Sequence, residues 1–388
     1  MPRWPRVLAI ACMLAGWSVA ARAQDLPRGV VIDDVKCVDD PSQSYALYLP
    51  SGYSADRHWN VLIGFHPGAR GRLIVEKYRA AAEQYGYVVA GSNNSRNGPW
   101  SVSMDAVRAM VPDLARRFAL DPKRVYLTGH SGGARVAMQV ALANNTVAGV
   151  IASSGGYPDS QPRSNVSFAV FSTAGTEDFN YIEMRMLDLK LTSPHRLAVF
   201  AGGHTLPPDA VALEAIEWME LQAMKSGARA RDESLVDGWL SRRRRMIEQS
   251  SGGAQAVHLL EALVADFTGL RDVSAEASRL KELSRDRDVK RALDRERADD
   301  TSEARAMTEF VELEAGLADA SRRADALMAL RNRLSTLAQK AGMPDESPER
   351  ARARRVLRAV TSGAAGRVQD REYLALLQQY GRQDRAPR

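Results

Sequence analysis

Hydrophobic and polar residues alternate in short blocks along the first half of the chain. Apolar runs of strand length, most of them closed by Gly or Pro, predict strands at 45–50, 60–65, 87–90, 124–128, 147–152, 168–173 and 196–201. Apolar residues at helical spacing predict helices at 73–84, 104–118, 134–143 and 209–224. Strands and helices in alternation are typical of an α/β fold, with a mostly parallel sheet and helices on both faces. Functional loops of such sheets leave the carboxyl ends of the strands.

The second half of the chain is predicted to be all-α. Residues 302–341 contain no Pro and one Gly, and their apolar residues follow a 3-4 repeat that only Arg331 breaks. We therefore expect one long amphipathic helix that packs against partner helices in a hairpin or bundle. A break at 344–348 precedes shorter helices near 349–361 and 370–380. The repeat consists of Phe310, Leu313, Leu317, Ala320, Ala324, Leu327, Leu334 and Ala341.

Charge divides the chain in the same place. Charged residues are about twice as dense after residue 224 as before it. We predict an α/β domain at 24–226 and an α-helical accessory domain at 227–388, joined by a polar linker at 225–231 that few contacts cross. The net charge of +6 is modest, and acidic residues are interleaved with the basic run at 242–245, so no nucleic-acid partner is expected. Self-association, contact with proteins or the cell envelope, and a lid over the site stay open as roles of the helical domain.

The first 23 residues predict an export signal. Arg3 and Arg6 precede an uncharged, largely apolar run at 7–21, and 21–23 offers the small residues that a signal peptidase reads. The run is too short to span about 30 Å of hydrocarbon, and no later apolar run reaches about 18 residues. We therefore expect a secreted or periplasmic protein whose mature chain has no transmembrane segment.

The strongest chemical signal is the segment Gly129-His130-Ser131-Gly132-Gly133. This G-x-S-x-G follows a predicted strand and opens a predicted helix, which is the setting of a nucleophile elbow. The flanking glycines allow a tight turn in which backbones pass closely. The turn is expected to lift the Ser131 hydroxyl above the sheet, with a helix N-terminus behind it that favours developing negative charge.

A serine nucleophile needs a base, and the base needs an orienting acid. Both follow Ser131 in the chain, each on the loop after its own predicted strand. We assign the base to His204, which follows two glycines, and the acid to Asp178. Glu177 is the adjacent alternative for the acid. His195 precedes its strand and would lie at the wrong edge of the sheet.

These motifs resemble the α/β-hydrolase superfamily, and more narrowly its secreted esterases of the polyhydroxybutyrate-depolymerase-like and feruloyl-esterase-like kind. The resemblance rests on 129–133, Gly175-Thr-Glu-Asp178, Gly203-His204 and Phe65-His66-Pro67-Gly68, and it covers about residues 30–226. It implies an α/β-hydrolase sheet and the hydrolysis of esters through an acyl-enzyme, with no metal or cofactor.

The resemblance also implies an oxyanion hole built from two backbone N–H groups. The first is that of Gly132, after the nucleophile. The second comes from the loop after the second predicted strand, where Pro67 has no N–H to give. Gly68 and Ala69 both stay open as this donor. We expect His66 to hold the loop by hydrogen bonds rather than to take protons.

Aromatic and imidazole side chains near these loops are the candidates for the substrate pocket. Trp100 and Arg96 lie on the loop after the strand at 87–90. Either Trp100 lines the acyl or alcohol pocket and Arg96 meets an anionic substrate, or Trp100 packs within the loop and Arg96 is solvated. His66 and His130 complete the candidate set.

The sequence thus predicts a carboxylic-ester hydrolase acting on a small-molecule or polymeric ester. Two other classes stay open. One is a catalytically silent hydrolase-fold protein that binds or assembles through its helical domain. The other is a serine peptidase of similar fold. All three triad positions are filled, which favours the esterase.

Overall fold

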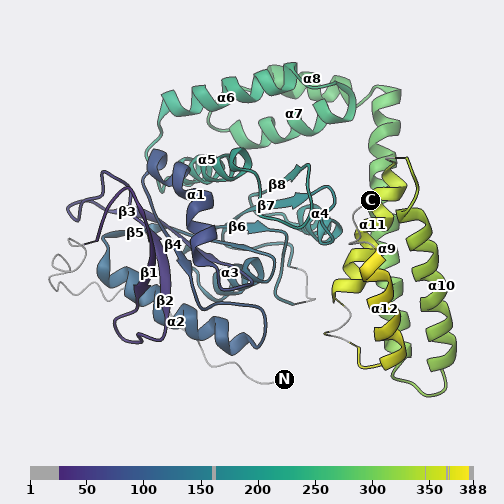
Figure 1. Cartoon of the computed structure of the whole chain (residues 1–388). Helices are drawn as coiled ribbons and strands as arrows, with labels where there is room; N and C mark the ends of the chain where they lie inside the picture. Colours follow the sequence, from purple (N-terminus) through teal and green to yellow (C-terminus); the bar gives the residue numbers. More distant parts are fainter. Residues whose placement is uncertain (1–25, 160–162, 346, 364–365, 367, 384–388) are drawn as a thin grey trace.

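The computed structural model describes residues 26–159, 163–345, 347–363, 366 and 368–383. Its centre is an eight-stranded sheet in the order β1-β2-β4-β3-β5-β6-β7-β8 (Figure 1). β2 pairs antiparallel with both β1 and β4, and the remaining pairs, from β4–β3 to β7–β8, are parallel. The strands are β1 Val31–Lys36, β2 Ser44–Tyr48, β3 Trp59–Phe65, β4 Tyr87–Ser92, β5 Leu120–His130, β6 Val147–Ser153, β7 Ala169–Gly175 and β8 His195–Phe200.

Helices cover both faces of this sheet. One face packs against α1 and α5, and the other against α2, α3 and α4. The bounds are α1 Gly71–Tyr85, α2 Trp100–Arg117, α3 Gly132–Ala143, α4 Tyr181–Lys190 and α5 Asp209–Lys225. The predicted α/β class is confirmed, and so is the alternation of strands and helices read from the sequence.

The continuous apolar run of β3 is explained by burial on both faces. Val61 and Ile63 belong to the core under α2 and α3, whereas Leu62 belongs to the core under α1 and α5. Gly64 faces α1 so closely that an added Cβ would lie 2.2 Å from Ile74 Cγ2. A strand that is buried under helices on both faces has no polar face, so its sequence shows no alternation of apolar and polar residues.

The chain after α5 is helical throughout the part that the structure describes. Helices α6 and α7 lie against α5, α8 packs on α7, and α9 to α12 form a bundle beside α4 (Figure 1). The predicted all-α region and the bundle around its amphipathic helix are confirmed. The bounds are α6 Glu233–Glu248, α7 Gly253–Phe267, α8 Ser274–Leu283, α9 Arg287–Gly316, α10 Arg323–Ala341, α11 Pro348–Gly363 and α12 Arg371–Gln383.

The predicted single helix at 302–341 is wrong, because two helices share this stretch. Gly316 ends α9, and the carboxylate of Asp319 accepts the Ser321 N–H at 2.9 Å in a turn before α10. An Asp that binds the backbone two residues on is a turn signal. The 3-4 repeat nevertheless marks the core on both sides of the turn, since Phe310 and Leu334 are buried in one cluster.

Two elements of the sheet domain were not predicted from the sequence. β1 is an edge strand with mixed burial, so its sequence lacks a clean alternation. α4 carries polar residues on several sides because it lies between the sheet and α9. Both were missed because their burial is divided among several neighbours.

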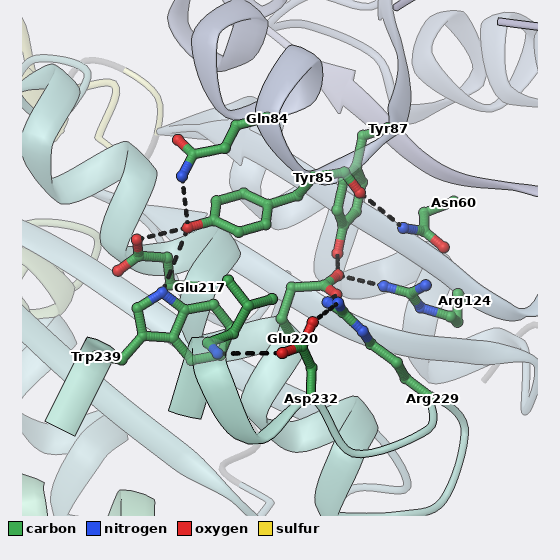
Figure 2. Close-up of polar contacts among 11 residues, drawn as sticks. Asn60, Gln84, Tyr85, Tyr87, Arg124, Glu217, Glu220, Arg229, Asp232 and Trp239 are labelled. Carbon is green, nitrogen blue, oxygen red and sulfur yellow. Dashed lines mark hydrogen bonds and ion pairs between the residues drawn. The ribbon is translucent and has the colours of Figure 1, made fainter. Parts of the chain in front are cut away.

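Residues 225–231 do not form the sparsely contacted linker that the sequence predicts. Arg229 pairs with the fully buried carboxylate of Glu220, which also accepts from the Tyr87 hydroxyl and pairs with Arg124 (Figure 2). A buried carboxylate requires such partners to offset its lost hydration. The polar character of the segment therefore reflects ion pairing to the sheet domain rather than solvation.

The predicted export signal at 1–23 lies outside the described residues. In the part of the chain that is described, the search for a helix long and apolar enough to cross a membrane finds none.

Candidate active site

Ser131 occupies a strained turn between β5 and α3. Its backbone has φ 54° and ψ −121°, a conformation that a non-glycine residue adopts at a cost of about 1–3 kcal/mol. Such strain persists only where the surrounding structure enforces it, and it clusters at functional sites. The turn places Ser131 at the carboxyl end of β5 and at the N-terminus of α3, as the sequence predicts.

The glycines around Ser131 are required by backbone contacts. A Cβ on Gly129 would lie 2.3 Å from the carbonyl carbon of Gly133, and a Cβ on Gly133 would lie 2.1 Å from the Phe65 oxygen. Real Cβ atoms do not approach backbone this closely, so any larger residue would push α3 away from β3 and β5. The G-x-S-x-G spacing is therefore a packing requirement of the elbow.

His204 and Asp178 meet at the same edge of the sheet. The His204 Nδ1 lies 2.8 Å from Asp178 Oδ1, and the carboxylate also accepts the Asn180 N–H at 2.8 Å. A carboxylate only accepts hydrogen bonds, so Nδ1 carries the proton and Nε2 is left as the acceptor. Burial would raise the pKa of Asp178, but the hydrogen bond and charge of His204 hold it below its usual value.

Backbone bonds between two loops bring this pair together. The Thr176 N–H donates to the Phe200 oxygen and the Glu177 N–H donates to the Gly202 oxygen, both at 2.8 Å. The close approach of these two loops requires a glycine at position 175, because a Cβ on Gly175 would lie 2.3 Å from the Gly202 oxygen. The loop after β7 and the loop after β8 therefore form one unit.

The alternative residues occupy other places. Glu177 is 39% exposed and pairs with Arg358 and Arg354 of α11. His195 begins β8, and its Nδ1 lies 2.7 Å from the Ser193 oxygen. Neither is hydrogen-bonded to His204. Ser131 and His204 are not hydrogen-bonded to each other either.

His66 and His130 are buried behind Ser131. The His130 ring lies 4.8 Å from that of His204 and 6.1 Å from that of His66, centre to centre. Burial, with the nearby His204 second, lowers the pKa of His130 to about 3. Burial and then the Arg70 charge lower that of His66 to about 4. Both rings are therefore neutral near pH 7.

The loop after β3 uses its own N–H groups. Gly68 donates to His66 Nδ1 at 3.0 Å, and Ala69, at φ 55°, donates to the His66 oxygen at 3.1 Å. Both candidates for the second oxyanion donor therefore have partners in this structure. Gly132 is the first residue of α3, so its N–H has no partner within the helix. The Asn97 amide lies against it, 1.9 Å from where a Gly132 Cβ would be.

A cavity of about 690 Å³ opens at Ser131 and Gly132. On the sheet side it is lined by the exposed Arg96 of the loop after β4, by the exposed Trp100 at the start of α2, and by Phe179. Trp100 thus lies in the wall, whereas His66 and His130 are not among the lining residues. The far wall comes from the helical region, through Ala304, Met307, Ala359, Ser362 and Gly363.

The sequence left a lid over the site open as a role of the helical domain, but it identified neither the residues of this far wall nor the α11 arginines that contact Glu177. The signal that could have drawn attention to them is the run at 348–358, which places five arginines within eleven residues. Nothing in that run says which surface it faces. Asn97 was also missed, because one Asn in a polar loop has no distinguishing pattern.

The strand order, the two-sided helical cover and the strained Ser131 turn define the α/β-hydrolase fold, as the resemblance implies. No family model and no curated protein matches the chain. Solved structures do match, each over about half of this chain. The feruloyl esterase module of Clostridium thermocellum is 15% identical over 50% of this chain and 89% of its own, with a TM-score of 0.40.

Two further solved structures have the same relation to the chain. Esterase B from Lactobacillus rhamnosis is 16% identical over 54% of this chain and 93% of its own, with a TM-score of 0.41. A thermophilic esterase from Thermogutta terrifontis is 13% identical over 54% and 98%, with a TM-score of 0.41.

Proposed function

We propose that the protein is a serine hydrolase that cleaves carboxylic esters. The observation that carries the proposal is the Asp178–His204 hydrogen bond at the edge of the sheet where the strained turn presents Ser131. A buried acid that fixes the tautomer of a histidine leaves its second nitrogen available as a base.

In the proposed reaction, Ser131 Oγ attacks the ester carbonyl while His204 Nε2 takes its proton. The developing oxyanion is stabilised by the Gly132 N–H and the N-terminus of α3. His204 then protonates the departing alcohol, which leaves an acyl group on Ser131. Water, activated by the same histidine, releases the acid. Asp178 keeps its negative charge throughout and stabilises the imidazolium.

The test combines covalent labelling with an ester series. A fluorophosphonate should label Ser131, located by mass mapping, and the protein should hydrolyse p-nitrophenyl esters from acetate to octanoate. Ser131→Ala should abolish the label and lower the turnover on the order of 10⁴-fold or more. Ser241→Ala, an exposed serine on α6, is the matched control. Retained activity in Ser131→Ala would overturn the proposal.

The two acidic neighbours give the second arm of this test. Asp178→Asn should cost about 10⁴-fold in turnover through the wrong tautomer of His204. Glu177→Gln should cost far less, because Glu177 does not touch the histidine. If Glu177→Gln lowers turnover strongly and Asp178→Asn lowers it only slightly, the orienting acid is Glu177 rather than Asp178. Absence of both label and hydrolysis would instead favour a binding or assembly protein on the same fold. Export through residues 1–23 remains part of the proposal.

A further inference from the structure

Helix α11 contacts the chain on both sides of Asp178. The Arg355 Nη1 donates to the Thr176 oxygen at 2.9 Å, two residues before the acid. The same guanidinium lies over the Tyr181 ring, 4.3 Å from its centre and three residues after the acid. A single arginine from the helical region thus bridges the loop that holds the proposed acid.

Arg355 is itself fixed by α9. Its Nε lies 2.9 and 3.2 Å from the two oxygens of Glu303, and the two side chains are only 11% and 2% exposed. Planar arginine–carboxylate pairs of this kind have a defined orientation, which a flexible lysine does not provide. The guanidinium therefore holds one position against the loop.

A second contact lies beside the first. Glu177 pairs with Arg358 at 3.2 Å and with Arg354 at 3.5 Å, from successive turns of α11. These three side chains are between 23% and 39% exposed, so this contact is weaker than the buried one. It joins α11 to the residue directly before Asp178.

The same two helices close the cavity at Ser131. Ala304 and Met307 of α9 and Ala359 of α11 line this cavity, which Trp100 of the sheet domain also lines. They are small or unbranched, which leaves space between the helices and the nucleophile. Whatever part of an ester extends away from Ser131 across this cavity must end against them.

We propose that α9 and α11 complete the active site. Arg355 is a positioning residue for the loop that carries Asp178, and Ala359 with Met307 sets how long a chain the ester can carry. The substrate class is then an ester with an apolar chain that reaches the helical region. This inference rests on the proposed function, and it makes the helical region part of the site rather than an accessory.

The first experiment is a double-mutant cycle between Arg355→Gln and Asp178→Asn in the full chain, read as the second-order rate of fluorophosphonate labelling. If Arg355 acts through Asp178, Arg355→Gln alone should lower this rate and the kcat for p-nitrophenyl acetate at least tenfold, with KM changed less than threefold. In the Asp178→Asn background the further loss should shrink below threefold, because residues that act as a unit are not additive.

The control is Arg333→Gln, which removes an exposed arginine of α10 that pairs with Glu309 and should leave the rate unchanged. Equal losses in both backgrounds, or no loss at all, would overturn the positioning role. Should Arg355→Gln fail to fold, Glu177→Gln replaces it in the cycle. It should cost three- to tenfold alone and less than twofold beside Asp178→Asn.

The second experiment narrows the cavity. Ala359→Phe should lower the ratio of kcat/KM for p-nitrophenyl octanoate to that for acetate at least tenfold. Ala298→Phe, at an exposed position of α9, should leave the ratio unchanged. An unchanged ratio in Ala359→Phe would overturn the proposal that Ala359 limits how long a chain the ester can carry.

The outcomes separate the two proposals. A wild-type chain that is neither labelled nor active overturns the esterase and this inference together. A chain that is labelled at Ser131 and active, but in which the Arg355 and Ala359 variants behave as their controls do, overturns this inference alone.

Discussion

The helical region meets the sheet domain at two seams of different character. The inner seam joins α5 to α6 and α7 through an apolar cluster that includes Leu221, Met224 and Trp239. The active-site seam joins α9 and α11 to α4 and to the Asp178 loop, mainly through arginine–carboxylate pairs such as that of Arg185 with Asp300. One seam is a continuation of the core and the other is a set of directed polar contacts.

Because of this difference, the two seams have different roles in stability and in the orientation of the site. Apolar burial is non-directional and contributes about 25 cal/mol for each Å² removed from water, so the inner seam stabilises the fold. The partly exposed pairs of Glu177 with Arg354 and Arg358 contribute little to stability but fix orientation. We therefore expect damage to the inner seam to unfold the protein, and loss of these Glu177 pairs to leave it folded and slow.

The largest effect should follow from cutting the chain. The sequence alone predicts that 24–226 folds and works by itself. The structure leads us to expect that this fragment is insoluble, because Leu221 and Met224 lose their cover and the Trp218 indole loses Asp266. A fragment that ends at residue 285 keeps the inner seam and should be soluble, with much reduced turnover. Solubility and thermal unfolding of both fragments test this.

The opposite result would also be informative. If the fragment 24–226 is soluble, unfolds cooperatively and hydrolyses p-nitrophenyl acetate, the inner seam is dispensable and the boundary drawn from the sequence is right.

The next effect concerns the buried carboxylate of Glu220, which joins the segment after α5 to the sheet. Glu220→Ala leaves the guanidinium groups of Arg124 and Arg229 without their buried partner (Figure 2). Removing one member of a buried ion pair costs about 3–5 kcal/mol of unfolding free energy. Urea unfolding should show this loss. Glu309→Ala, whose partner Arg333 is exposed, should cost less than about 1 kcal/mol. Equal losses in the two variants would contradict the contrast between buried and exposed pairs.

How far the sequence could predict these features depends on how local they are. The Ser131 turn could be predicted because its glycines are needed by contacts with their own neighbours, as at Gly129 and Gly133. The Asp178 and His204 positions followed from strand order, since both loops leave the carboxyl ends of adjacent parallel strands. The pattern of one strand or one turn contains that information.

Neither the seams nor the ion pairs of Glu220 could be predicted from the sequence, and the physical reason is the same in each case. Glu220 and Arg229 are ordinary helix and loop residues until the fold buries one against the other. Arg355 is one of several arginines in a helix, and only the path of the chain shows that it faces Thr176, 179 residues earlier. Contacts between distant segments leave no period in the sequence.

Two histidines outside both seams make the stability of the fold depend on pH. His66 and His130 have folded-state pKa values of about 4 and about 3, below the ordinary value near 6.5. Between pH 6.5 and 4 the unfolded chain therefore binds more protons than the folded one. Stability should fall as the pH falls through this window, by up to about 1.4 kcal/mol per pH unit for each histidine. Urea unfolding at pH 7, 5.5 and 4.5 measures the slope.

A double variant isolates the two groups. His66→Gln with His130→Asn should flatten the slope in this window, whatever it does to stability at pH 7. His258→Gln is the control, because His258 pairs with Glu296 and Glu261 and its pKa is raised by them. A double variant with the slope of the wild type would contradict the assignment.

The smallest effect should come from salt, and it tests the active-site seam without a change to the core. The contacts of Glu177 with Arg354 and Arg358 are partly exposed, so salt at 1 M, with a screening length of about 3 Å, should weaken them. The apolar inner seam is not weakened by salt in this way. We expect 1 M KCl to lower kcat for p-nitrophenyl acetate about two- to threefold while the midpoint of urea unfolding does not fall.

Glu177→Gln has already lost these pairs, so its kcat should be lower at low salt and should not fall further at 1 M. If salt slows Glu177→Gln as much as the wild type, the effect lies elsewhere, and the polar contacts of α11 do not control the loop that carries Asp178.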